Sequence, residues 1–511
     1  MSGWTSSAGL AIHDLVPERL RRRWVAEGYC PDRDLYSLFT GQARSRPHQA
    51  AVIDDEGSMT YSELHRAVRA LAGSLSAAGL GTQDVIGVQV QDGRHAVVAE
   101  LAVAAAGSVC LPIPPGRGES DLATLLGGAR AAAVIVDSAS PISLVRERIQ
   151  YLPAVFVLPC DGTDPTSLPV PDPEAPARIL VSSGSESTPK MVAYSHNAIA
   201  GGRANYIRAV HGDTSGIRDL LLVSLASSYG SFGAAVTLCC LGGTLILCGR
   251  FDPARALQAI GKHRPTHVFG VPTMLRRMAM LSPSHDEDLS SVRAMVSSGD
   301  VLHQSTVDLC RRRFGVDVVS VYGSADGVNT HTREPELGTG FPDPAVTDIQ
   351  VRGDEVIARG PMTPLCYVGA PQLDARYRLP GGWVRTGDHG RIDDDGRLHL
   401  LGRIKRVIIR GGHTISPAEV ERELSTHPEI AEVACVPIPD ADLGERLCAC
   451  VAPRPGRAVP SLAALAEFLS QRGLEPRKLP ERLAVFSELP LGHTGKVCHR
   501  TLSQLARQSQ Q

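Results

Sequence analysis

The segments AAVIDD (50–55), YSELHRAVRALAGSLSAAGL (61–80) and VIGVQV (85–90) decide the fold class, because they place a helical pattern between two short apolar runs. The outer two have the length and β-branched content of buried strands, and the middle one has apolar residues at helical spacing. The same alternation continues through AAAVIVD (131–137) and RAMVSSG (293–299). Strands that alternate with helices predict an α/β fold of parallel sheets covered by helices on both faces.

The chain has 511 residues, more than the ~250–300 at which a single hydrophobic core stops growing, so we expect at least two domains. After Pro361 the apolar runs become shorter and turns become more frequent, and the C-terminal part has the pattern of a separate compact unit. We therefore predict a core of residues 1–403 and a smaller unit of residues 404–511. The tail from Ala506 onward is expected to fray.

The composition is typical of a soluble globular protein. Hydrophobic residues make up 43% of the chain, charged residues 21%, and the net charge is -2. This balance gives no reason to expect a nucleic-acid partner. The basic runs LRRR (20–23) and CRRRFG (310–315) are expected on solvated helix faces.

The cysteine pattern and the N-terminus both favour a cytoplasmic protein. The twelve cysteines show neither CxxC spacing nor a Cys/His cluster, so we expect no zinc site and no disulfide framework. Residues 1–23 lack the basic-then-apolar order of a signal peptide. The apolar run 97–114 is interrupted by Glu100 and Gly107, which predicts a buried helix leading into a strand and no membrane span.

Three loops rich in small residues each follow a predicted strand. They are SSGSESTPK (182–190), SSGD (297–300) and YGSADG (322–327). Ligands of parallel sheets collect at the carboxyl ends of strands. In the first loop, small residues let backbone N–H groups converge on an anion, and Lys190 adds a positive charge, although Glu186 opposes it. Such a loop taken alone is more often a plain surface turn.

Five motifs in fixed order nevertheless resemble one family. They are SSGSESTPK, VYGSADG (321–327), WVRTGD (383–388), GRIKRVIIRGGHTISPAEVE (402–421) and LGHTGKVCHR (491–500). The chain is similar, from about residue 35 to residue 502, to the adenylate-forming superfamily of acyl-CoA synthetases, nonribosomal peptide adenylation domains and luciferases. The stretches at 21–39, 444–453 and 469–486 look most like the stand-alone aryl-acid AMP ligases, such as the dihydroxybenzoate-AMP ligases.

The resemblance implies a fold and a two-step reaction. The fold is a large N-terminal domain of parallel-rich sheets sandwiched by helices, with a distorted β-barrel and a small mobile α+β C-terminal domain. In the reaction, a carboxylate attacks the ATP α-phosphate to give acyl-AMP and pyrophosphate, and a pantetheine thiol then displaces AMP. This chemistry depends on charge compensation more than on acid or base groups. ATP is a substrate, and Mg²⁺ is the expected cofactor.

The resemblance also implies roles for particular residues. Lys496 matches the catalytic lysine that bridges the substrate carboxylate and the α-phosphate, and Lys405 matches the hinge. The phosphate loop comprises Ser183, Gly184, Ser185, Glu186 and Lys190. The adenine and ribose residues are Ser298, Gly299, Asp300, Tyr322, Gly323, Asp388 and Arg403. The acyl substrate meets Ser227, Ser228, Tyr229, Gly299, Gly327 and Val328, Mg²⁺ meets Asp326 and Glu186, and Gly411 and Gly412 line the pantetheine tunnel.

Glu186 departs from the family pattern, which usually has Thr-Gly at Glu186 and Ser187. A bare carboxylate beside a triphosphate is repulsive by several kcal/mol at ~4 Å and an effective dielectric constant of ~20. We interpret Glu186 as a ligand of Mg²⁺ or a partner of a cation such as Lys190. The alternatives are a side chain that faces solvent and a degraded phosphate loop. Asp326 stands where the family usually has a glutamate, a change that a water-mediated Mg²⁺ contact would tolerate.

The segment SLASSYGSFG (224–233) bears on the acid. Ser227, Ser228 and Tyr229 stand where the aryl-acid ligases have His-Asn-Tyr, and the aspartate that anchors an amino-acid ammonium is missing. A small aromatic acid is the first expectation and an aliphatic acid the second. The alternatives are an amino-acid or β-amino-acid AMP ligase, an ATP-dependent diazotase or amide-forming ligase on an aminoaryl acid, and a noncatalytic nucleotide-binding relative. The expected acceptor is a carrier protein in trans or CoA, and the expected state is a monomer or homodimer without nucleic-acid or membrane partners.

Overall fold

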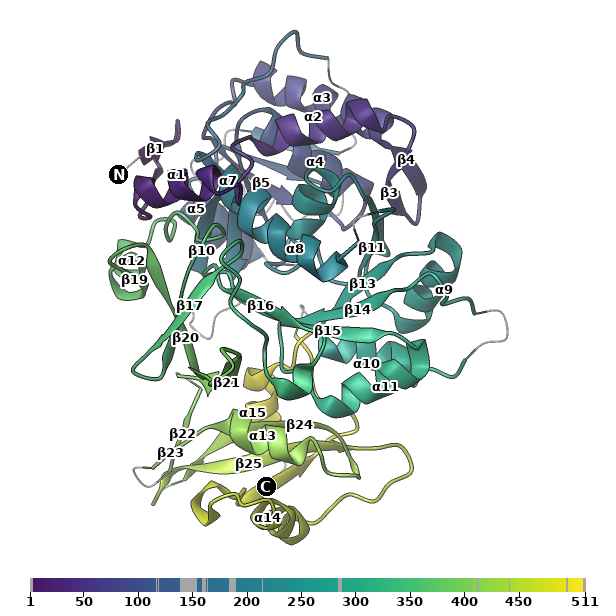
Figure 1. The fold of residues 1–511 in the computed structure, drawn as a ribbon, viewed down its shortest axis with the longest axis vertical. Helices are drawn as coiled ribbons and strands as arrows, with labels where there is room; N and C mark the ends of the chain where they lie inside the picture. Colours follow the sequence, from purple (N-terminus) through teal and green to yellow (C-terminus); the bar gives the residue numbers. More distant parts are fainter. Residues whose placement is uncertain are drawn as a thin grey trace.

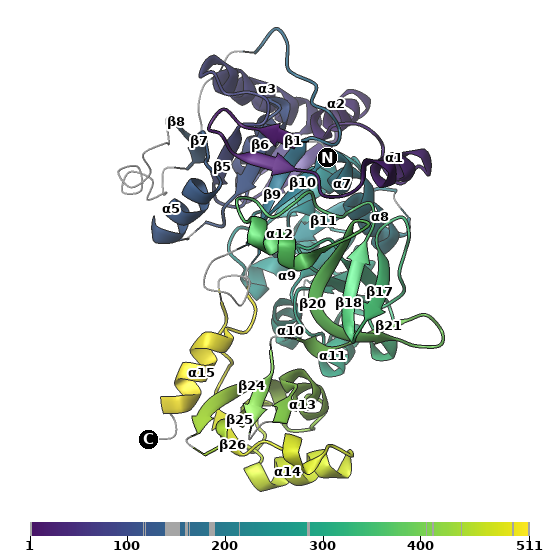
Figure 2. The ribbon, with the colours of Figure 1, turned by 90° about the vertical axis from the view of Figure 1, so that its left-hand side faces the viewer.

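The structure is a computed structural model of the whole chain. It describes residues 3–508 except 116, 118, 138–153, 159–161, 163, 183–189, 214, 284–286, 405, 411–412, 441 and 493–494. Figure 1 shows a large body, coloured purple to green, above a smaller one, coloured light green to yellow, that holds the C-terminus. Figure 2 shows the same separation from the side. The predicted arrangement of a large N-terminal and a small C-terminal domain is confirmed.

The first sheet of the large body is mainly parallel. Its strand order is β10 (Lys190–Ser195), β9 (Pro176–Ser182), β6 (Val109–Pro112), β5 (Val85–Gln89), β7 (Ala133–Val136) and β8 (Ala154–Val157). Only β10 runs antiparallel to its neighbour among these described strands. Its helical neighbours in the chain are α3 (Tyr61–Ala77), α4 (Arg94–Ala105) and α5 (Glu119–Gly128). Thr60 and Glu63 form a capping box that fixes the start of α3.

The second sheet follows the same principle. Its order is β16 (Asn329–Thr332), β15 (Asp317–Gly323), β14 (Ala294–Ser298), β13 (His267–Gly270), β11 (Arg218–Leu221), β12 (Thr244–Leu247), β3 (Ala50–Asp54) and β4 (Gly57–Thr60). The pairs from β15 through β3 are parallel, and the two edge strands are antiparallel. The associated helices are α2 (Leu35–Ser45), α7 (His196–Ala198), η1 (Ile199–Arg203), α8 (Ala204–His211), η2 (Gly233–Leu238), α9 (Pro253–His263), α10 (Pro272–Met280) and α11 (Gln304–Phe314).

Helix α4 lies between the two sheets, where it contacts β5 and β6 of the first and β3 of the second. Every residue from Ala96 to Ala105 is buried, so the prediction of a buried helix leading into a strand is confirmed. Glu100 is tolerated there because Arg178 on β9 binds it through two hydrogen bonds of 2.7 and 2.9 Å. Arg178 also donates to Leu225 O, which anchors the start of the segment 224–233.

The third sheet is antiparallel and corresponds to the part of the large body for which the resemblance implied a distorted β-barrel. It contains β17 (Asp348–Arg352), β18 (Glu355–Arg359), β20 (Trp383–Ile392), β19 (Arg378–Leu379) and β21 (Leu398–Arg403), with α12 (Pro371–Tyr377) and η3 (Pro335–Leu337) nearby in the chain. The smaller body contains β23 (His413–Ile415), β22 (Ile408–Arg410), β25 (Gly444–Pro453), β24 (Ile430–Asp440) and β26 (Arg482–Val485), with α13 (Pro417–Leu424), α14 (Leu462–Gln471), η4 (Pro476–Lys478) and α15 (His499–Gln508). The change of sheet falls between Arg403 and Ile408, and the exact domain boundary stays a prediction.

One expectation about the ends of the chain is wrong. The tail does not fray at Ala506, because α15 continues to Gln508 and buries the Ala506 side chain completely. At the N-terminus, α1 (Glu18–Ala26) contains the basic run 20–23 that was expected on a helix, whereas the sequence analysis made no prediction for β1 (Gly3–Thr5) and β2 (Ala11–His13).

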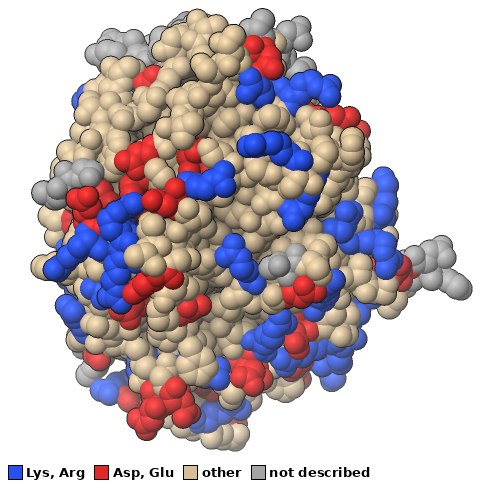
Figure 3. All heavy atoms as spheres, turned by 45° about the horizontal axis from the view of Figure 1, so that its top comes forward, with Lys and Arg blue, Asp and Glu red and all other residues tan. Residues whose placement is uncertain are grey.

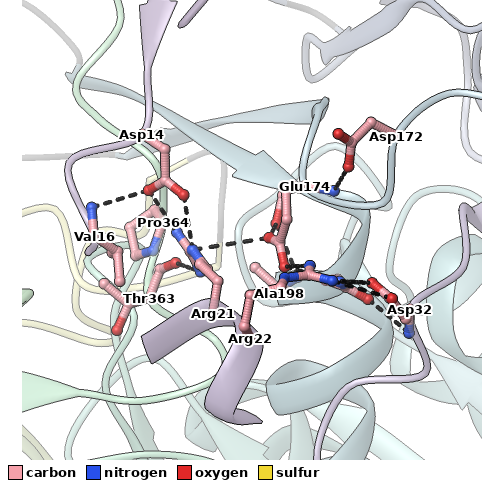
Figure 4. A network of polar contacts seen from close by, with 12 residues as sticks. Asp14, Val16, Arg21, Arg22, Asp32, Asp172, Glu174, Ala198, Thr363 and Pro364 are labelled. Carbon is pink, nitrogen blue, oxygen red and sulfur yellow. Dashed lines mark hydrogen bonds and ion pairs between the residues drawn. The ribbon is translucent and has the colours of Figure 1, made fainter. Parts of the chain in front are cut away.

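The basic run at the start of α1 is not wholly a solvated surface. Arg21 is 3% exposed and binds both carboxylate oxygens of Asp14, while it also donates to Thr363 O. The neighbouring Arg22 binds Asp32 and Glu174 near the surface (Figure 4). The network therefore ties α1 to segments far away in the sequence, which a charge pattern alone cannot show.

The charged side chains are mixed on the face shown in Figure 3, where blue and red residues lie next to one another. This mixture agrees with the net charge of -2. Among the described residues, no helix is long and apolar enough to cross a membrane. The described cysteines are all free.

Candidate active site

The carboxyl ends of β14 and β15 bring the predicted adenine residues together. Ser298 ends β14 and is paired with Val321 on β15, which is followed directly by Tyr322. Gly299 then turns the chain with φ +94°, a conformation that favours glycine. The aromatic ring of Tyr322 and the backbone at Gly299 thus lie at neighbouring strand ends, as the family resemblance implied.

Asp388 connects this edge to the third sheet. Tyr322 donates its hydroxyl to Asp388 Oδ2 at 2.6 Å, and Arg403 Nε lies 2.8 Å from Asp388 Oδ1. The strands β20 and β21 pair Asp388 directly with Arg403. Burial raises the pKa of Asp388 above its usual value, and the Arg403 charge works against this rise. Three residues that the sequence placed at one nucleotide therefore do lie together.

Lys496 reaches the same site from the smaller body. A Cβ atom at Gly299 would lie 2.8 Å from Lys496 Cε and 3.1 Å from Lys496 Nζ, so the lysine chain passes directly over this glycine. Burial lowers the pKa of Lys496, while the nearby Asp300 carboxylate opposes that effect and Arg403 adds to it. A side chain larger than glycine at position 299 would displace the ammonium from the residues predicted to bind the nucleotide.

Helix α10 holds the smaller body in this position. Thr273 donates its hydroxyl to Gly495 O at 2.6 Å, immediately before Lys496. Arg276 Nη1 donates to Ala431 O at 3.1 Å, and Arg277 forms an ion pair of 2.6 Å with Glu488. These contacts were not visible in the sequence, because α10 has no motif that distinguishes it from other surface helices.

Lys190, the described end of the phosphate loop, lies over aromatic rings. Its Nζ is 3.9 Å from the centroid of Tyr377 and 5.7 Å from that of Tyr367, which is the geometry of a cation–π contact. Tyr367 in turn donates its hydroxyl to Asp326 Oδ1. Sequence analysis missed both tyrosines, since they are separated from Lys190 by more than 170 residues and belong to no motif.

Asp326 has one oxygen that suits a cation. Tyr367 occupies Oδ1, whereas the contact of Oδ2 is a long one, 3.5 Å from Ser324 Oγ. The side chain is partly exposed. Mg²⁺ typically takes one or two carboxylates and completes its shell with water and phosphate oxygens, so a single carboxylate oxygen fits that requirement.

The segment 224–233 uses several of its hydroxyls internally. Ser227 Oγ donates to Ser224 O at 2.7 Å and accepts from Gly230 N at 2.9 Å. Tyr229 donates to Val296 O on β14 at 3.2 Å. These hydroxyls stabilise the turn, so they are less available to a substrate than the sequence suggested.

Two other predicted substrate residues are close by. Gly327 has φ +91° and approaches the backbone of Met362 and the ring of Pro364, and Val328 is completely buried against Ile349 and the rest of that cluster. The asparagine position of the family pattern, Ser228, presents its carbonyl to a buried arginine, Arg203. Asp92 supports the same segment through Leu225 N at 2.9 Å, and burial raises the pKa of Asp92 to about 6.

Some predicted residues lie outside the described part of the chain. They are Ser183, Gly184, Ser185, Glu186, the hinge Lys405 and the pair Gly411 and Gly412. Their roles stay predictions from the family resemblance.

One further cluster has the composition of a metal site. In the described part of the chain, His211, Asp219 and His267 form the one such group, with ligand atoms within 4.8 Å of one another. His211 Nδ1 lies 2.7 Å from Ile207 O, and its Nε2 lies 2.8 Å from Asp219 Oδ1. Both partners accept hydrogen bonds, so both ring nitrogens carry protons and offer no lone pair. Burial lowers the pKa of His211, but the Asp219 carboxylate outweighs it and the pKa is raised. His211 and Asp219 form a buried ion pair. Asp219 and His267 lie at the amino ends of β11 and β13, whereas the predicted nucleotide residues lie at the carboxyl ends of β14 and β15.

Comparisons with known proteins agree with this geometry. A family model described as AMP-binding enzyme matches residues 39–360, and one described as AMP-binding enzyme C-terminal domain matches residues 419–496. Triostin synthetase I of Streptomyces triostinicus is 30% identical, over 96% of this chain and 98% of that protein. The salicyl-AMP ligase / salicyl-S-ArCP synthetase of Mycobacterium tuberculosis is 28% identical, over 93% of this chain and 91% of that protein.

The fold is shared with solved structures as well. The amide bond synthetase McbA from Marinactinospora thermotolerans has a TM-score of 0.81 to this chain at 27% identity, and the match covers 92% of this chain and 99% of that one. The first family match includes Lys190, Ser298 and Tyr322, and the second reaches Lys496. The resemblance predicted from five motifs is confirmed, and the chain belongs to the AMP-binding enzyme family of adenylate-forming ligases.

Proposed function

We propose that the protein activates a small aromatic carboxylic acid with ATP, releases pyrophosphate, and passes the acyl group from acyl-AMP to the pantetheine thiol of a carrier protein or CoA. The observation that carries this proposal is the position of Lys496, whose ammonium lies over Gly299 beside the predicted nucleotide residues. The similarity to a salicyl-AMP ligase supports an aromatic acid. The missing ammonium anchor argues against an ordinary amino acid.

Asp388, Tyr322 and Lys496 each have a part in the proposed first step. Asp388 would accept hydrogen bonds from the ribose hydroxyls, and the Tyr322 ring would stack on adenine. The acid's carboxylate oxygen would attack the α-phosphorus, the bond to pyrophosphate would break, and its electron pair would leave with pyrophosphate. Lys496 would stabilise the negative charge that gathers on the α-phosphate oxygens.

Mg²⁺ would neutralise charge on the phosphate oxygens, and Asp326 is the described residue that fits it. Lys190 lies among Tyr367 and Tyr377 at the base of the phosphate loop, where its charge would meet the outer phosphates. In the proposed second step, Lys405 is the hinge for rotation of residues 404–511, and the thiol displaces AMP at the acyl carbon.

An ATP–pyrophosphate exchange assay with a panel of acids tests the proposal. Benzoate, substituted benzoates and heteroaromatic acids are expected to support exchange, while aliphatic and α-amino acids of similar size support it at least about 10-fold less well, the difference that ~1.4 kcal/mol of pocket contacts gives. Thioester formation is then followed with CoA and with a carrier protein that bears a free pantetheine thiol. A protein that binds ATP yet exchanges no label with any acid would instead be a noncatalytic relative.

Glu186 provides a prediction about the phosphate loop. If its carboxylate binds Mg²⁺ or a cation, Glu186→Gln weakens the response to Mg²⁺ and lowers exchange, because an amide is a poorer ligand for a hard cation. Glu186→Thr then lowers exchange too. Mg²⁺ titrations of both variants measure this. A Thr variant that is faster than the parent, with unchanged Mg²⁺ dependence, would show that the glutamate only repels the triphosphate.

A further inference from the structure

Arg203, at the end of η1, is a buried cation with no counter-ion among the residues that the structure describes. The buried arginines of the described chain are Arg21, Arg178 and Arg203, each no more than 4% exposed. Arg21 is bound by both oxygens of Asp14, and Arg178 by both oxygens of Glu100. Within the described residues, Arg203 has no carboxylate within ion-pair distance.

The contacts of Arg203 use only part of its hydrogen-bonding capacity. Its Nη1 donates to Ser228 O at 2.9 Å and to Ser231 Oγ at 3.0 Å, and its Cζ lies 5.4 Å from the ring centroid of Tyr194. Its Nε is buried and has no hydrogen-bond partner among the described residues. A buried, underused guanidinium is unfavourable unless a partner arrives, since an unpaired charge in the interior costs several kcal/mol.

The position of Arg203 indicates where that partner comes from. Ser228 and Ser231 belong to the segment predicted to contact the acyl substrate. On the other side, Tyr194 donates its hydroxyl to Ala325 O at 2.9 Å, two residues before Gly327 of the same predicted site. Arg203 and Tyr194 therefore connect the two segments that are expected to enclose the acid. A functional group of the acid is the partner best placed to reach the guanidinium.

We propose that the acid activated by this protein carries a second anionic oxygen group, such as a ring carboxylate, and that Arg203 binds that group while the first carboxylate reacts. The inference rests on the proposed function, because it assigns the substrate class of the same site. A planar guanidinium fork matches a carboxylate in two parallel hydrogen bonds, and few other groups satisfy it as well. Arg203 is thus a specificity residue, and the reacting carboxylate remains the task of Lys496.

The test compares benzoate with phthalate, isophthalate and terephthalate in the pyrophosphate exchange assay, using the parent, Arg203→Met and Arg203→Lys. In the parent, at least one dicarboxylate is expected to exceed benzoate in kcat/KM by about 10–100-fold, the effect of one or two charge-assisted hydrogen bonds. Arg203→Met loses this preference, so that its kcat/KM for the dicarboxylates is no greater than its kcat/KM for benzoate. Arg203→Lys keeps part of the preference for a dicarboxylate, because the positive charge remains. It does not keep all of it, because an ammonium cannot form the two parallel hydrogen bonds of a guanidinium. Arg208→Met, an exposed arginine five residues further along, is the matched control and keeps the parent's preference.

Thermal unfolding gives a readout that does not depend on turnover. The preferred dicarboxylate raises the Tm of the parent and leaves that of Arg203→Met unchanged. Without ligand, Arg203→Met is expected to lower the Tm, because Ser228 O and Ser231 Oγ lose their donor. The readout is therefore the Tm shift that the dicarboxylate causes within each protein, and a purely structural arginine would leave that shift unchanged when replaced.

The outcomes separate the two proposals. Equal rates for benzoate and all dicarboxylates in the parent, or a preference that survives Arg203→Met, overturns the assignment of Arg203. The assignment also fails if no dicarboxylate gives either exchange or a Tm shift. A dicarboxylate that raises the Tm only when Arg203 is present, but supports no exchange, upholds the anion site and contradicts the proposed acid activation.

Discussion

Replacing Lys496 with alanine is expected to abolish acyl-AMP formation while ATP still binds. The ammonium lies over Gly299, and the hydrogen bond from Thr273 to Gly495 O holds the backbone directly before Lys496, so its charge is already in place before the reaction begins. Removing one such preorganised donor typically lowers kcat by about 10²–10³-fold. The residues predicted to hold adenine and ribose, Tyr322 and Asp388, are untouched, so the Kd for ATP stays within a few-fold of the parent.

The measurement pairs pyrophosphate exchange with ATP binding by calorimetry. Lys478→Ala is the matched control, because Lys478 lies in the same smaller body and binds Glu419, away from the nucleotide site. It is expected to retain the parent's rate. Exchange by Lys496→Ala within a factor of a few of the parent would show that another cation performs this task.

The pH dependence of the parent follows from the same site. Burial lowers the pKa of Lys496 below its usual value, and Asp300 only partly opposes this. Because the proposed step needs the charged ammonium, exchange is expected to fall on the alkaline side at a lower pH than an exposed lysine would give. This limb should be missing from the residual activity of Lys496→Ala.

The parts of the fold that were predictable are those with a local pattern. Parallel strands and their helices repeat apolar residues at fixed spacing, and α4 was visible as a buried helix because its apolar run has a helical length. The same reasoning misjudged Arg21, because whether a basic residue faces water depends on a distant partner, here Asp14 and the carbonyl of Thr363. Charge patterns record composition and carry no information about such contacts.

The candidate site likewise contains residues that the sequence could predict and residues that it could not. Asp388, Tyr322 and Lys496 were found because each lies in a motif whose order could be matched. Tyr377 and Arg203 could not be found, since a cation–π contact, or a buried guanidinium with no carboxylate partner in the described part of the chain, arises only when separate elements meet. The sequence also could not show that the folded segment uses the hydroxyls of Ser227 and Tyr229 in hydrogen bonds to its own turn and to β14.

The second large effect is expected from Asp388→Asn, which should raise the KM for ATP by roughly 10–100-fold. The change keeps the shape of the side chain but removes the charge that both Tyr322 and Arg403 now bind. An amide has a single acceptor oxygen, so if that oxygen accepts from Arg403, the amide nitrogen faces Tyr322 and the hydrogen bond from the Tyr322 hydroxyl is lost or reversed. The proposed hydrogen bonds to the ribose would also weaken, and a charge-assisted bond contributes about 1.5–3 kcal/mol.

Asp393→Asn is the control for this prediction, because Asp393 is an acid of the same β20–β21 hairpin that binds His399 and the Arg397 backbone, away from the nucleotide. Its KM for ATP should not change.

Burial raises the pKa of Asp388, so the parent should lose affinity for ATP as the pH falls through that raised pKa and the carboxylate becomes protonated. Asp388→Asn has no such group to titrate, and its KM should depend less on pH over the same acid range. An unchanged KM in Asp388→Asn, with the parent's acid limb intact, would place the ribose elsewhere and leave Asp388 as a structural anchor for Tyr322 and Arg403.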